Sequence, residues 1–350
     1  MEFIEIDGSE GEGGGQMVRT ALTLSAVTGR AFRIINIRAN RPEPGLRSQH
    51  LQAVFAARDI CSAAVEGAEK SSRALSFVPG KIAPGKHDVN IGTAGSTSLV
   101  LQTIALPLSM AEGESEVTIT GGTHVEWAPT YDYLAEAWLP LMRRIGLDID
   151  LELVAPGFYP KGGGQIRATI RPAASLAPLV LTERGDLKSV RVLAAVNNLP
   201  VEIAERFVKR ADSQLRSRRI RHVKTAIKTS SAVGRGTYLR ILADYENIPA
   251  CFTGLGRIGK QAESIADETV EEFIEFHRSG ATVDAHMADQ LLLPLALSKG
   301  DSAFTAPRIS PHFQTNSAVI AKFLPVAVST SPADNLATII QIATKGVRPL

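Results

Sequence analysis

Apolar positions along the chain repeat with two different periods, and the two periods alternate in a regular way. Near the start, Met1–Asp7 alternates apolar and acidic or polar residues, which is typical of a half-buried strand. Further along, short strand-like or Gly-rich stretches are each followed by a run with helical spacing. The segments of this kind are Ile4–Thr28, Phe32–Ala64, Val89–Ala111, Val117–Ile145 and Leu151–Ile170. The pattern predicts an α+β protein built from repeated units.

Two of these segments show the pattern in detail. In Phe32–Ala64, the stretch Gly45–Cys61 places its apolar residues at helical spacing and therefore predicts a helix. In Val117–Ile145, a strand is expected at Val117–Thr120, followed by a glycine turn and a helix at Tyr131–Ile145. The order strand, glycine turn, helix is the one expected of repeated α+β units.

From about Leu181 the composition of the chain changes, and charged residues become more frequent. The elements expected there are a strand at Asp186–Ala195, a charged helix at Glu202–Arg219, a strand at Arg235–Tyr245 and an acidic helix at Glu263–Phe276. After Gly280 the apolar texture of the first half, punctuated by Gly and Pro, returns. We therefore predict a discontinuous core of residues 1–183 and 278–350, interrupted by a smaller inserted α/β domain at 184–277.

Composition narrows the class of protein. The 350 residues are 44% hydrophobic and 21% charged, with a net charge of +2, as expected of a soluble globular chain whose nucleic-acid contacts are local. Cys61 and Cys251 are far apart and form no metal or disulfide pattern. The stretch Ile91–Ala111 is too polar to span a membrane, and the N-terminus lacks the features of a signal peptide. We expect a cytoplasmic protein without a membrane segment.

A glycine-rich turn marks the first candidate site. Gly11–Gln16 leads directly into an amphipathic helical run that contains Arg19. Free backbone N–H groups at a helix N-terminus attract anions, and a nearby guanidinium strengthens that attraction. The order of glycines matches neither the P-loop nor the dinucleotide fingerprint. A tight turn that binds no ligand remains the alternative.

Charged residues near this turn suggest a site for phosphate and metal. Glu12 would repel a phosphate unless a hard cation such as Mg²⁺ lay between them, so it is a candidate metal ligand, with a solvated loop acid as the alternative. Arg38, Arg41 and Arg47 bracket a proline-stiffened loop and are suited to hold a triphosphate. Solvation at the surface is the alternative for each arginine.

Two further segments carry groups that suit phosphate. Gly157–Gly164 is a second glycine-rich turn that contains a lysine, and it either contacts a phosphodiester or simply joins two strands. The run Arg216–Lys224 is the clearest basic patch, although such runs are usually solvated faces. Because this run lies in the predicted insert, any role of it in binding nucleic acid would be peripheral.

His312 is the candidate for covalent chemistry. A single histidine is most often structural, but Ser310-Pro311 gives this one a rigid approach, and Thr315 and Asn316 are expected to orient it. A neutral imidazole nitrogen attacks phosphorus without first losing a proton at neutral pH. Neither a serine hydrolase motif nor a zinc spacing competes for this histidine. These residues favour covalent nucleotidyl transfer.

Seven motifs, taken together, carry a family resemblance. They are Gly8–Gln16, Ile37–Arg41, Pro44–Leu46, Gly92–Ser96, Gly121–His124, Gly157–Pro160 and Asp289–Leu291. In this order and approximate spacing, and with His312 present, the chain resembles from end to end the catalytic branch of the RNA 3′-terminal phosphate cyclase family. The match of order and spacing is more specific than any single glycine pattern.

The resemblance implies both a fold and an activity. The fold would be α+β, with a core of three repeated units, each a four-stranded sheet backed by two helices, and a smaller inserted α/β domain. The activity would be that of a ligase that uses ATP to convert the 3′-terminal phosphate of an RNA into a 2′,3′-cyclic phosphodiester. The route would run through AMP covalently attached to His312 and then through an RNA-(3′)pp(5′)A intermediate, releasing AMP and pyrophosphate.

The resemblance also implies residue roles. The ATP contacts would be Gln102, Pro129, His286, Met287, Ala288, Asp289, Gln290, Arg19, Arg38 and Arg41. His286 stands where the family often has an aromatic residue. Glu12 would bind Mg²⁺ or Mn²⁺. Contacts with RNA or phosphate are expected from Gln16, Arg47, Gln49 and His50, and the partner would be an RNA with a 3′-phosphate end.

Two other readings of the sequence differ in function. A non-catalytic relative that serves in ribosome assembly or RNA binding would lack the nucleophilic histidine, which this chain has. An enolpyruvyl-transferase-like enzyme would need two similar large domains, whereas the predicted insert is short. The sequence does not indicate an oligomeric state.

Overall fold

The computed structural model describes residues 2–12, 14–333 and 336–344. Within these residues it is a mixed α+β structure with four four-stranded sheets, each containing one parallel and two antiparallel strand pairs. The predicted fold class is thus confirmed. Met1 of the predicted first strand and Gly13 of the glycine turn lie outside the described residues.

The first sheet has the strand order β1-β2-β4-β3. Its strands are β1 (Ile4–Asp7), β2 (Phe32–Ile35), β3 (Ala64–Glu66) and β4 (Leu75–Val78). Helix α1 (Gln16–Thr28) connects the parallel pair β1 and β2, and α2 (Ser48–Cys61) connects β2 to β3. Both predicted helices are confirmed, with α2 beginning three residues after the expected Gly45.

The second sheet has the order β5-β6-β8-β7. Its strands are β5 (Lys86–Asn90), β6 (Ser115–Gly121), β7 (Asp148–Ala155) and β8 (Gly164–Arg171). Helix α3 (Thr97–Ser109) connects β5 to β6. The helix predicted after β6 is present but contains a π-helical turn, and its parts are α4 (Tyr131–Tyr133), η1 (Leu134–Trp138) and α5 (Leu139–Ile145).

The third sheet has the order β15-β16-β14-β9 and joins two distant parts of the chain. Its strands are β9 (Val180–Leu181), β14 (Ser302–Ala306), β15 (Val326–Pro332) and β16 (Thr338–Thr344). Helices α8 (Ala285–Ala296) and α9 (Pro311–Phe323) precede and follow β14. Strand β9 pairs with β14 in parallel although more than a hundred residues separate them.

The fourth sheet, with the order β11-β10-β12-β13, is formed by the chain between β9 and α8. Its strands are β10 (Leu187–Asn197), β11 (Val223–Ser230), β12 (Gly236–Tyr245) and β13 (Pro249–Leu255). Helices α6 (Glu202–Ser217) and α7 (Ala262–Ser279) pack together against it. Both helices and the strands β10 and β12 match the sequence prediction, whereas β11 and β13 were not predicted.

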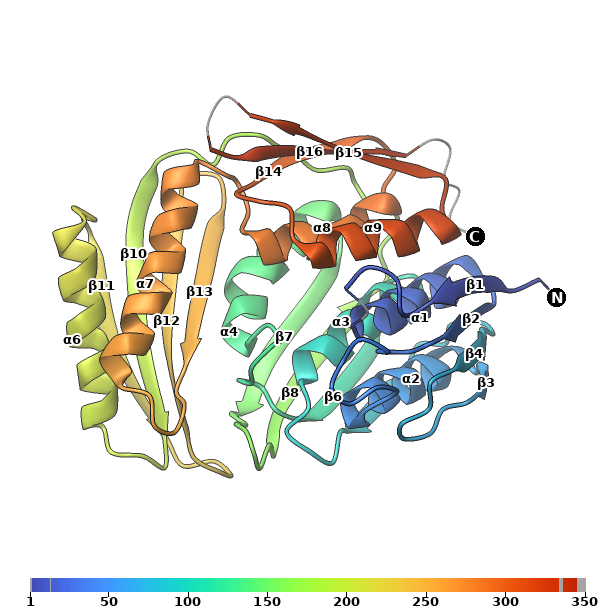
Figure 1. Cartoon of the computed structure of the whole chain (residues 1–350), viewed down its shortest axis with the longest axis horizontal. Helices are drawn as coiled ribbons and strands as arrows, with labels where there is room; N and C mark the ends of the chain where they lie inside the picture. The colour runs from blue at the N-terminus through green and yellow to red at the C-terminus, as the bar shows by residue number, and fades with distance from the viewer. Residues whose placement is uncertain (1, 13, 334–335, 345–350) are drawn as a thin grey trace.

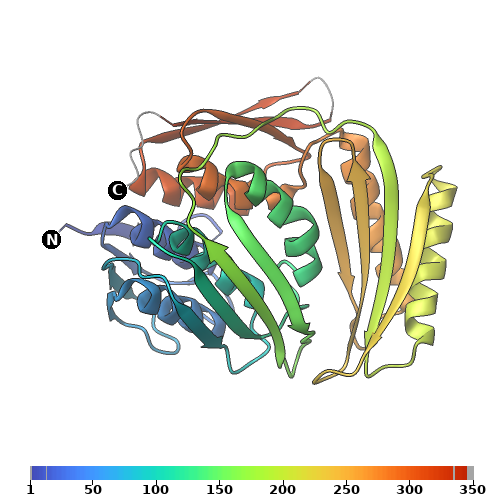
Figure 2. The ribbon, with the colours of Figure 1, turned by 180° about the vertical axis from the view of Figure 1, so that it is seen from behind.

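Two hydrophobic cores correspond to this arrangement. Buried residues of the first three sheets and their helices form one large cluster, and the fourth sheet with α6 and α7 encloses a second, smaller one. Figures 1 and 2 show the fourth sheet on the opposite side of the second sheet from the first sheet, with the third sheet above. In the described part of the chain, the helices are all too short or too polar to cross a membrane.

Aromatic and charged side chains join the fourth sheet to the second. The buried ring of His124 stacks on Phe158 and on Tyr238 of β12, with centroid distances of 5.4 and 4.3 Å. Arg240, also on β12, lies 3.1 Å from Glu136 of η1 and 3.7 Å from Asp132 of α4. These contacts hold one face of the fourth sheet against the second sheet's helix and loops.

Candidate active site

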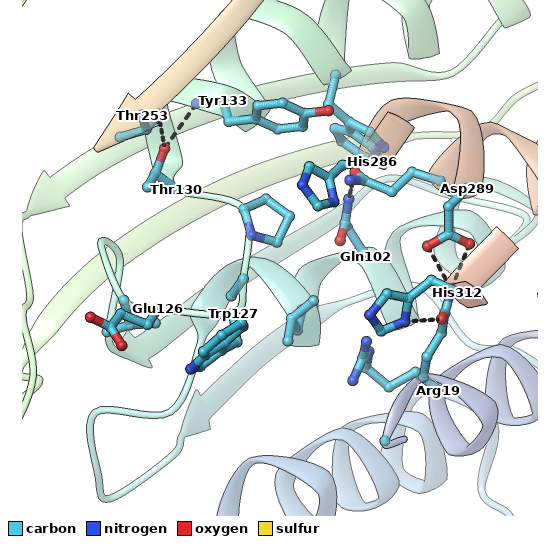
Figure 3. Close-up of a pocket in the computed structure, with 18 of the residues that line it drawn as sticks. Arg19, Gln102, Glu126, Trp127, Thr130, Tyr133, Thr253, His286, Asp289 and His312 are labelled. Carbon is cyan, nitrogen blue, oxygen red and sulfur yellow. Dashed lines mark hydrogen bonds between the residues drawn. The ribbon is translucent and has the colours of Figure 1, made fainter. Parts of the chain in front are cut away.

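A cavity of about 950 Å³ lies where the helices of the three core sheets meet the fourth sheet. Its walls come from α1, α3, α8 and α9 on one side and from β13, α7 and the loop 125–130 on the other. Figure 3 shows His312, Arg19 and Asp289 at one end of this cavity, and Glu126 and Trp127 at the other. Chain segments nearly three hundred residues apart therefore meet in one site, as the sequence predicted for its two ends.

His312 stands at the start of α9. The hydroxyl of Ser310 caps this helix by accepting a hydrogen bond from the backbone N–H of Phe313 at 3.1 Å, and Pro311 occupies the first helical position. This N-terminus follows the Ser-Pro signal in the sequence. The cap places the imidazole at the cavity, with 46% of its side chain exposed.

A chain of hydrogen bonds fixes the imidazole. Nδ1 of His312 lies 2.8 Å from Oε1 of Gln16, the first residue of α1. The amide nitrogen of Gln16 donates to both carboxylate oxygens of Asp289, at 2.6 and 2.7 Å. Asn316 also donates to Asp289, at 2.9 Å, and its own carbonyl oxygen accepts from Thr20.

This network assigns the tautomer of His312. Because the Gln16 amide nitrogen must face the carboxylate of Asp289, its oxygen faces His312 and acts only as an acceptor. Nδ1 therefore carries the proton and donates it to Gln16, and the lone pair is on Nε2. The nitrogen that remains available at the cavity is thus the one that carries the free lone pair.

Electrostatics favour the neutral imidazole. Burial lowers the pKa of His312 below its usual value, against the opposing charge of Asp289. Burial also raises the pKa of Asp289, although the hydrogen bonds from Gln16 and Asn316 oppose that rise. Arg19 is desolvated enough that its pKa falls to about 10, so it is still a cation at neutral pH. The site therefore combines a neutral imidazole with a fixed positive charge.

The glycine turn brings α1 close to α2. A Cβ at Gly15 would overlap the imidazole of His50, so only glycine permits this approach. His50 is buried near Arg19, Arg38 and Arg47, and burial followed by these charges lowers its pKa to about 3. Nδ1 of His50 accepts from the backbone N–H of Arg47 at 3.1 Å. His50 is therefore a neutral support of the turn that also lines the cavity.

The three predicted phosphate arginines have different environments. Arg38 and Arg41 line the cavity. Arg38 donates to the carbonyl oxygens of Glu43 and Gly45, at 2.7 and 3.1 Å, which holds its loop closed. Arg47 instead begins α2, pairs with Glu43 and lies outside the lining. The structure thus brings two of the three guanidinium groups to the cavity.

Glu12 lies between Arg41 and His312. It forms an ion pair with Arg41, and its Oε2 lies 2.5 Å from Nδ1 of His312. That oxygen is buried, and apart from this contact with His312 it has no hydrogen-bond partner in the described structure. In the described part of the chain, three or more His, Cys, Asp or Glu side chains do not gather into a metal site. A hard cation here would take one protein carboxylate oxygen and fill its other positions with phosphate and water oxygens, which suits Mg²⁺.

The remaining predicted ATP contacts fall into two groups. Gln102 of α3 donates to Gln290 of α8 at 2.5 Å, and both line the cavity with Pro129 and His286. Met287 and Ala288 are buried in the large core and do not line it. This follows from helix geometry, because consecutive residues of α8 point to different sides of the helix.

Sequence comparison gives the family. A sequence model of the RNA 3′-terminal phosphate cyclase family matches residues 10–330. This chain belongs to that family. It is similar to proteins named RNA 3′-terminal phosphate cyclase from Nostoc punctiforme (42% identical, covering 96% of this chain and 99% of the relative) and Ralstonia nicotianae (45% identical, covering 97% and 96%). These cyclases are ligase-type enzymes, and this chain is one of the same class.

A further comparison concerns the enolpyruvyl-transferase reading. The crystal structure of the enolpyruvyl transferase NikO from Streptomyces tendae aligns over 98% of this cyclase chain and 82% of its own, with 9% identity and a TM-score of 0.20. Superposition at that score supports no argument about fold or function.

Parts of the cyclase site were not predicted from the sequence. Thr315 and Asn316 were expected to orient His312, but the structure shows Gln16 in that role. Asn316 holds Asp289, while Thr315 accepts from the backbone N–H of Glu12 at 3.1 Å. The expected pair of side chains follows His312 on its own helix, and the actual partner comes from a contact that only the fold creates.

The residues that line the cavity opposite His312 were also not predicted from the sequence. Tyr133 donates to both carboxylate oxygens of Asp284, at 3.0 and 2.9 Å, and joins α4 to the cap of α8. Trp127 and the β13 residues from Cys251 to Leu255 also line the cavity. The available signal was the short spacing between the family motif Gly121–His124 and Pro129, a predicted ATP contact, which places Trp127 close in sequence to a predicted site residue.

Proposed function

We propose that this chain uses ATP to convert the 3′-terminal phosphate of an RNA into a 2′,3′-cyclic phosphodiester, with His312 as the covalent nucleophile. The observation that carries this proposal is the orientation of His312, whose Nδ1–H is held by Gln16 and Asp289 while Nε2 stays unprotonated. The names of the relatives at 40–45% identity support the overall reaction.

In the first step, Nε2 of His312 attacks the α-phosphorus of ATP. The N–P bond forms as the bond from the α-phosphorus to the bridging oxygen breaks, and pyrophosphate leaves. Arg19 and Arg41 line the same cavity and stabilise the charge that spreads over the phosphate oxygens. Gln102, Pro129 and His286 form the wall against which the adenosine part is expected to lie.

The proton on Nδ1 makes the second step possible. With Nδ1 still protonated, the imidazole that carries AMP on Nε2 is cationic, and the carboxylates of Glu12 and Asp289 lie close enough to stabilise that charge. An oxygen of the RNA 3′-phosphate then attacks the phosphorus of AMP. The N–P bond breaks and neutral imidazole leaves, which requires no proton transfer to the leaving nitrogen.

In the third step, the neighbouring 2′-hydroxyl oxygen attacks the 3′-phosphorus. The ring closes, the bond to AMP breaks, and the hydroxyl proton is lost to solvent. Nucleophile and electrophile belong to the same ribose, so no further positioning entropy is needed. Gln49 and His50 also line this end of the cavity and are available to contact the incoming phosphate, whereas Gln16 lines it with its amide engaged by Asp289 and His312, and Arg47 supports their loop.

Glu12 is the residue that would hold Mg²⁺ or Mn²⁺ in this scheme. Apart from its contact with His312, its buried Oε2 has no hydrogen-bond partner in the described structure, and carboxylate oxygen is the donor that such hard cations prefer. When bound, the cation supplies Lewis-acid polarisation of the phosphate oxygens.

We also propose that the fold consists of three copies of one unit with an insert. In the first three sheets the chain runs in the same order, strand, helix, parallel strand, helix, hairpin, and this order supports a repeat. The fourth sheet has its own buried core and interrupts the third unit between β9 and α8. The core would thus be residues 1–183 and 278–350, with the inserted domain at 184–277.

The test is labelling with ATP that carries a radioactive α-phosphate. The protein is incubated with this ATP and Mg²⁺, denatured and separated on a gel. We expect a labelled band that is acid-labile and alkali-stable, as a phosphoramidate is, and that a 3′-phosphorylated RNA discharges. An unlabelled band from protein that binds ATP would contradict the covalent mechanism and favour a non-catalytic RNA-binding role.

A further inference from the structure

An exposed tryptophan stands on the lining of the cavity, away from His312. Trp127 is 92% exposed, although large aromatic side chains are mostly buried in folded proteins. Its backbone has φ = 62°, a left-handed conformation that is uncommon for a residue other than glycine. Figure 3 shows the Trp127 side chain at the end of the pocket opposite His312 and Arg19. Nothing in the ATP-dependent step described above uses this ring.

The loop that carries Trp127 is fixed from both sides. Glu126 forms an ion pair with Arg257, which lies just after β13 of the fourth sheet. On the other side, residue His124 forms a bridge with Phe158 at the tip of the β7–β8 hairpin. The loop is therefore held between the second and fourth sheets, so the exposure of Trp127 is a property of an anchored segment.

A second aromatic ring and two basic groups are presented by neighbouring loops. Tyr159, next to the bridged Phe158, is 77% exposed. Lys161 and Arg235 are exposed and make no ion pair with any described residue. Their loops meet, because Gly163 packs against Val233 and Gly234 against Lys161. We call Trp127, Tyr159, Lys161 and Arg235 the cavity rim; Trp127 lines the cavity itself, and the other three lie on the adjoining loops.

This combination of groups suits single-stranded RNA. Proteins that bind single strands stack bases on aromatic faces and hold the phosphates with basic side chains. Binding to a membrane or to an acidic peptide needs more apolar area and more positive charge than the rim offers. Among the described residues the rim has two aromatic rings and two cations without an ion pair. A cavity of about 950 Å³ also lies near the upper end of the range of about 300–1,000 Å³ typical of small-molecule sites, which leaves room beyond one nucleotide.

We propose that the cavity rim binds the last two nucleotides of a single-stranded RNA 3′ end, with one of their bases stacked on Trp127. The inference rests on the proposed function, because the terminal phosphate must reach His312. It adds the path by which the RNA enters and the requirement that its end be unpaired. Lys161 and Arg235 would neutralise phosphates that precede the terminal one.

The first experiment measures binding without chemistry. The chain has two tryptophans, and because the buried Trp138 also lines the cavity, the quenching due to Trp127 is obtained by comparison with Trp127→Phe. A short 3′-phosphorylated oligoribonucleotide, added without ATP, is expected to quench the emission of the intact protein. Because no ATP is needed, quenching in a protein that never becomes labelled would support RNA binding at the cavity rim and refute only the histidyl mechanism. Absence of quenching would refute RNA binding at the cavity rim.

The second experiment separates RNA from ATP. Trp127→Ala is expected to raise the RNA KM about tenfold to a hundredfold while the ATP concentration needed for His312 labelling is unchanged, and Trp127→Phe is expected to restore most of the loss. An RNA that is abasic at one of its last two positions should bind the wild type and Trp127→Ala equally. A rise in the ATP requirement would assign the ring to adenine instead, and unchanged kinetics would assign it no role; either result overturns the proposal.

The third experiment tests the basic groups. Lys161→Ala and Arg235→Ala are each expected to lower RNA affinity and to reduce the slope of log affinity against log salt by about 0.7, the value for one phosphate contact on a single strand. Lys70→Ala is the matched control, because Lys70 is also exposed but lies on the first sheet between β3 and β4. Equal salt slopes in all three variants and the wild type would refute phosphate contacts at the rim.

Discussion

Two histidines of this chain lie beside carboxylates, yet the structure gives them opposite environments. His124 has a fully buried side chain, and both of its ring nitrogens are engaged, Nε2 with Asp132 and Nδ1 with Thr123, each at 2.8 Å. Aromatic rings cover it from Phe158 and Tyr238. His312 has one nitrogen engaged and a side chain that is 46% exposed at the cavity.

The difference shows that the second ring nitrogen decides the role of a histidine beside an acid. At His124 neither nitrogen is available, so the imidazole connects the second sheet to the fourth. Burial alone would raise the pKa of Asp132, but the contacts with His124 and Arg240 lower it below its usual value. At His312 the carboxylate acts through Gln16, and this intermediate amide leaves Nε2 open to a substrate.

The largest expected effect comes from His312→Asn. Loss of the nucleophile should reduce labelling by α-phosphate-labelled ATP at least about a thousandfold. The free energy of unfolding should change by less than about 0.5 kcal/mol, because the side chain is partly exposed. Gel labelling and urea unfolding measure the two quantities. Residual labelling at a tenth of the wild-type rate would show that another residue carries AMP.

The same substitution at His124 should reverse the pattern. His124→Asn removes the stacked ring and leaves Asp132 without its hydrogen bond, so we expect a loss of about 3 kcal/mol in the free energy of unfolding. The folded fraction should still become labelled at His312. His222→Asn is the control, because His222 is exposed and has a positive φ that asparagine tolerates. A stable His124→Asn protein would show that the contact between the second and fourth sheets does not depend on this ring.

The helices that form the His312 site were partly predicted from the sequence. Periodicity located α1 and α2, because that signal is local, whereas Ser310-Pro311 was expected only to give His312 a rigid approach and turned out to start α9. The interaction between Gln16 and His312 was beyond reach, since it joins side chains 296 residues apart through packing of α1 against α9. A residue's chemistry can be proposed from its type, but its tautomer depends on a partner that only the fold supplies.

The elements that were missed lack the usual pattern for a physical reason. Strand β11 lies at a sheet edge and is exposed on both faces over most of its length, so its sequence does not alternate. Strand β13 starts with a proline and contains Gly254, both of which are rare inside strands. The exposure of Trp127 was equally hidden, because an isolated tryptophan in a sequence normally indicates burial.

A smaller effect is expected from the amide that separates the acid from the imidazole. Gln16→Ala should slow labelling about a hundredfold, because a misplaced nucleophile loses the benefit of orientation. Gln16→Glu keeps an acceptor for Nδ1–H but adds a negative charge, which should raise the pKa of His312. Histidine signals in proton NMR titrations report that pKa directly. An unshifted pKa in Gln16→Glu would show that the side chain does not contact His312 in solution.

The smallest effect concerns the position of that pKa in the wild type. Burial favours the neutral ring, so the His312 signal, identified by its absence in His312→Asn, should titrate below pH 6.5. The lone pair on Nε2 then stays available as the pH falls to that value and is lost only below it. Arg41 contributes to the lowered pKa, so Arg41→Gln should move the midpoint upward by less than about one pH unit. A wild-type midpoint at or above 6.5 would mean that the nearby carboxylates of Asp289 and Glu12 outweigh the burial of the His312 imidazole.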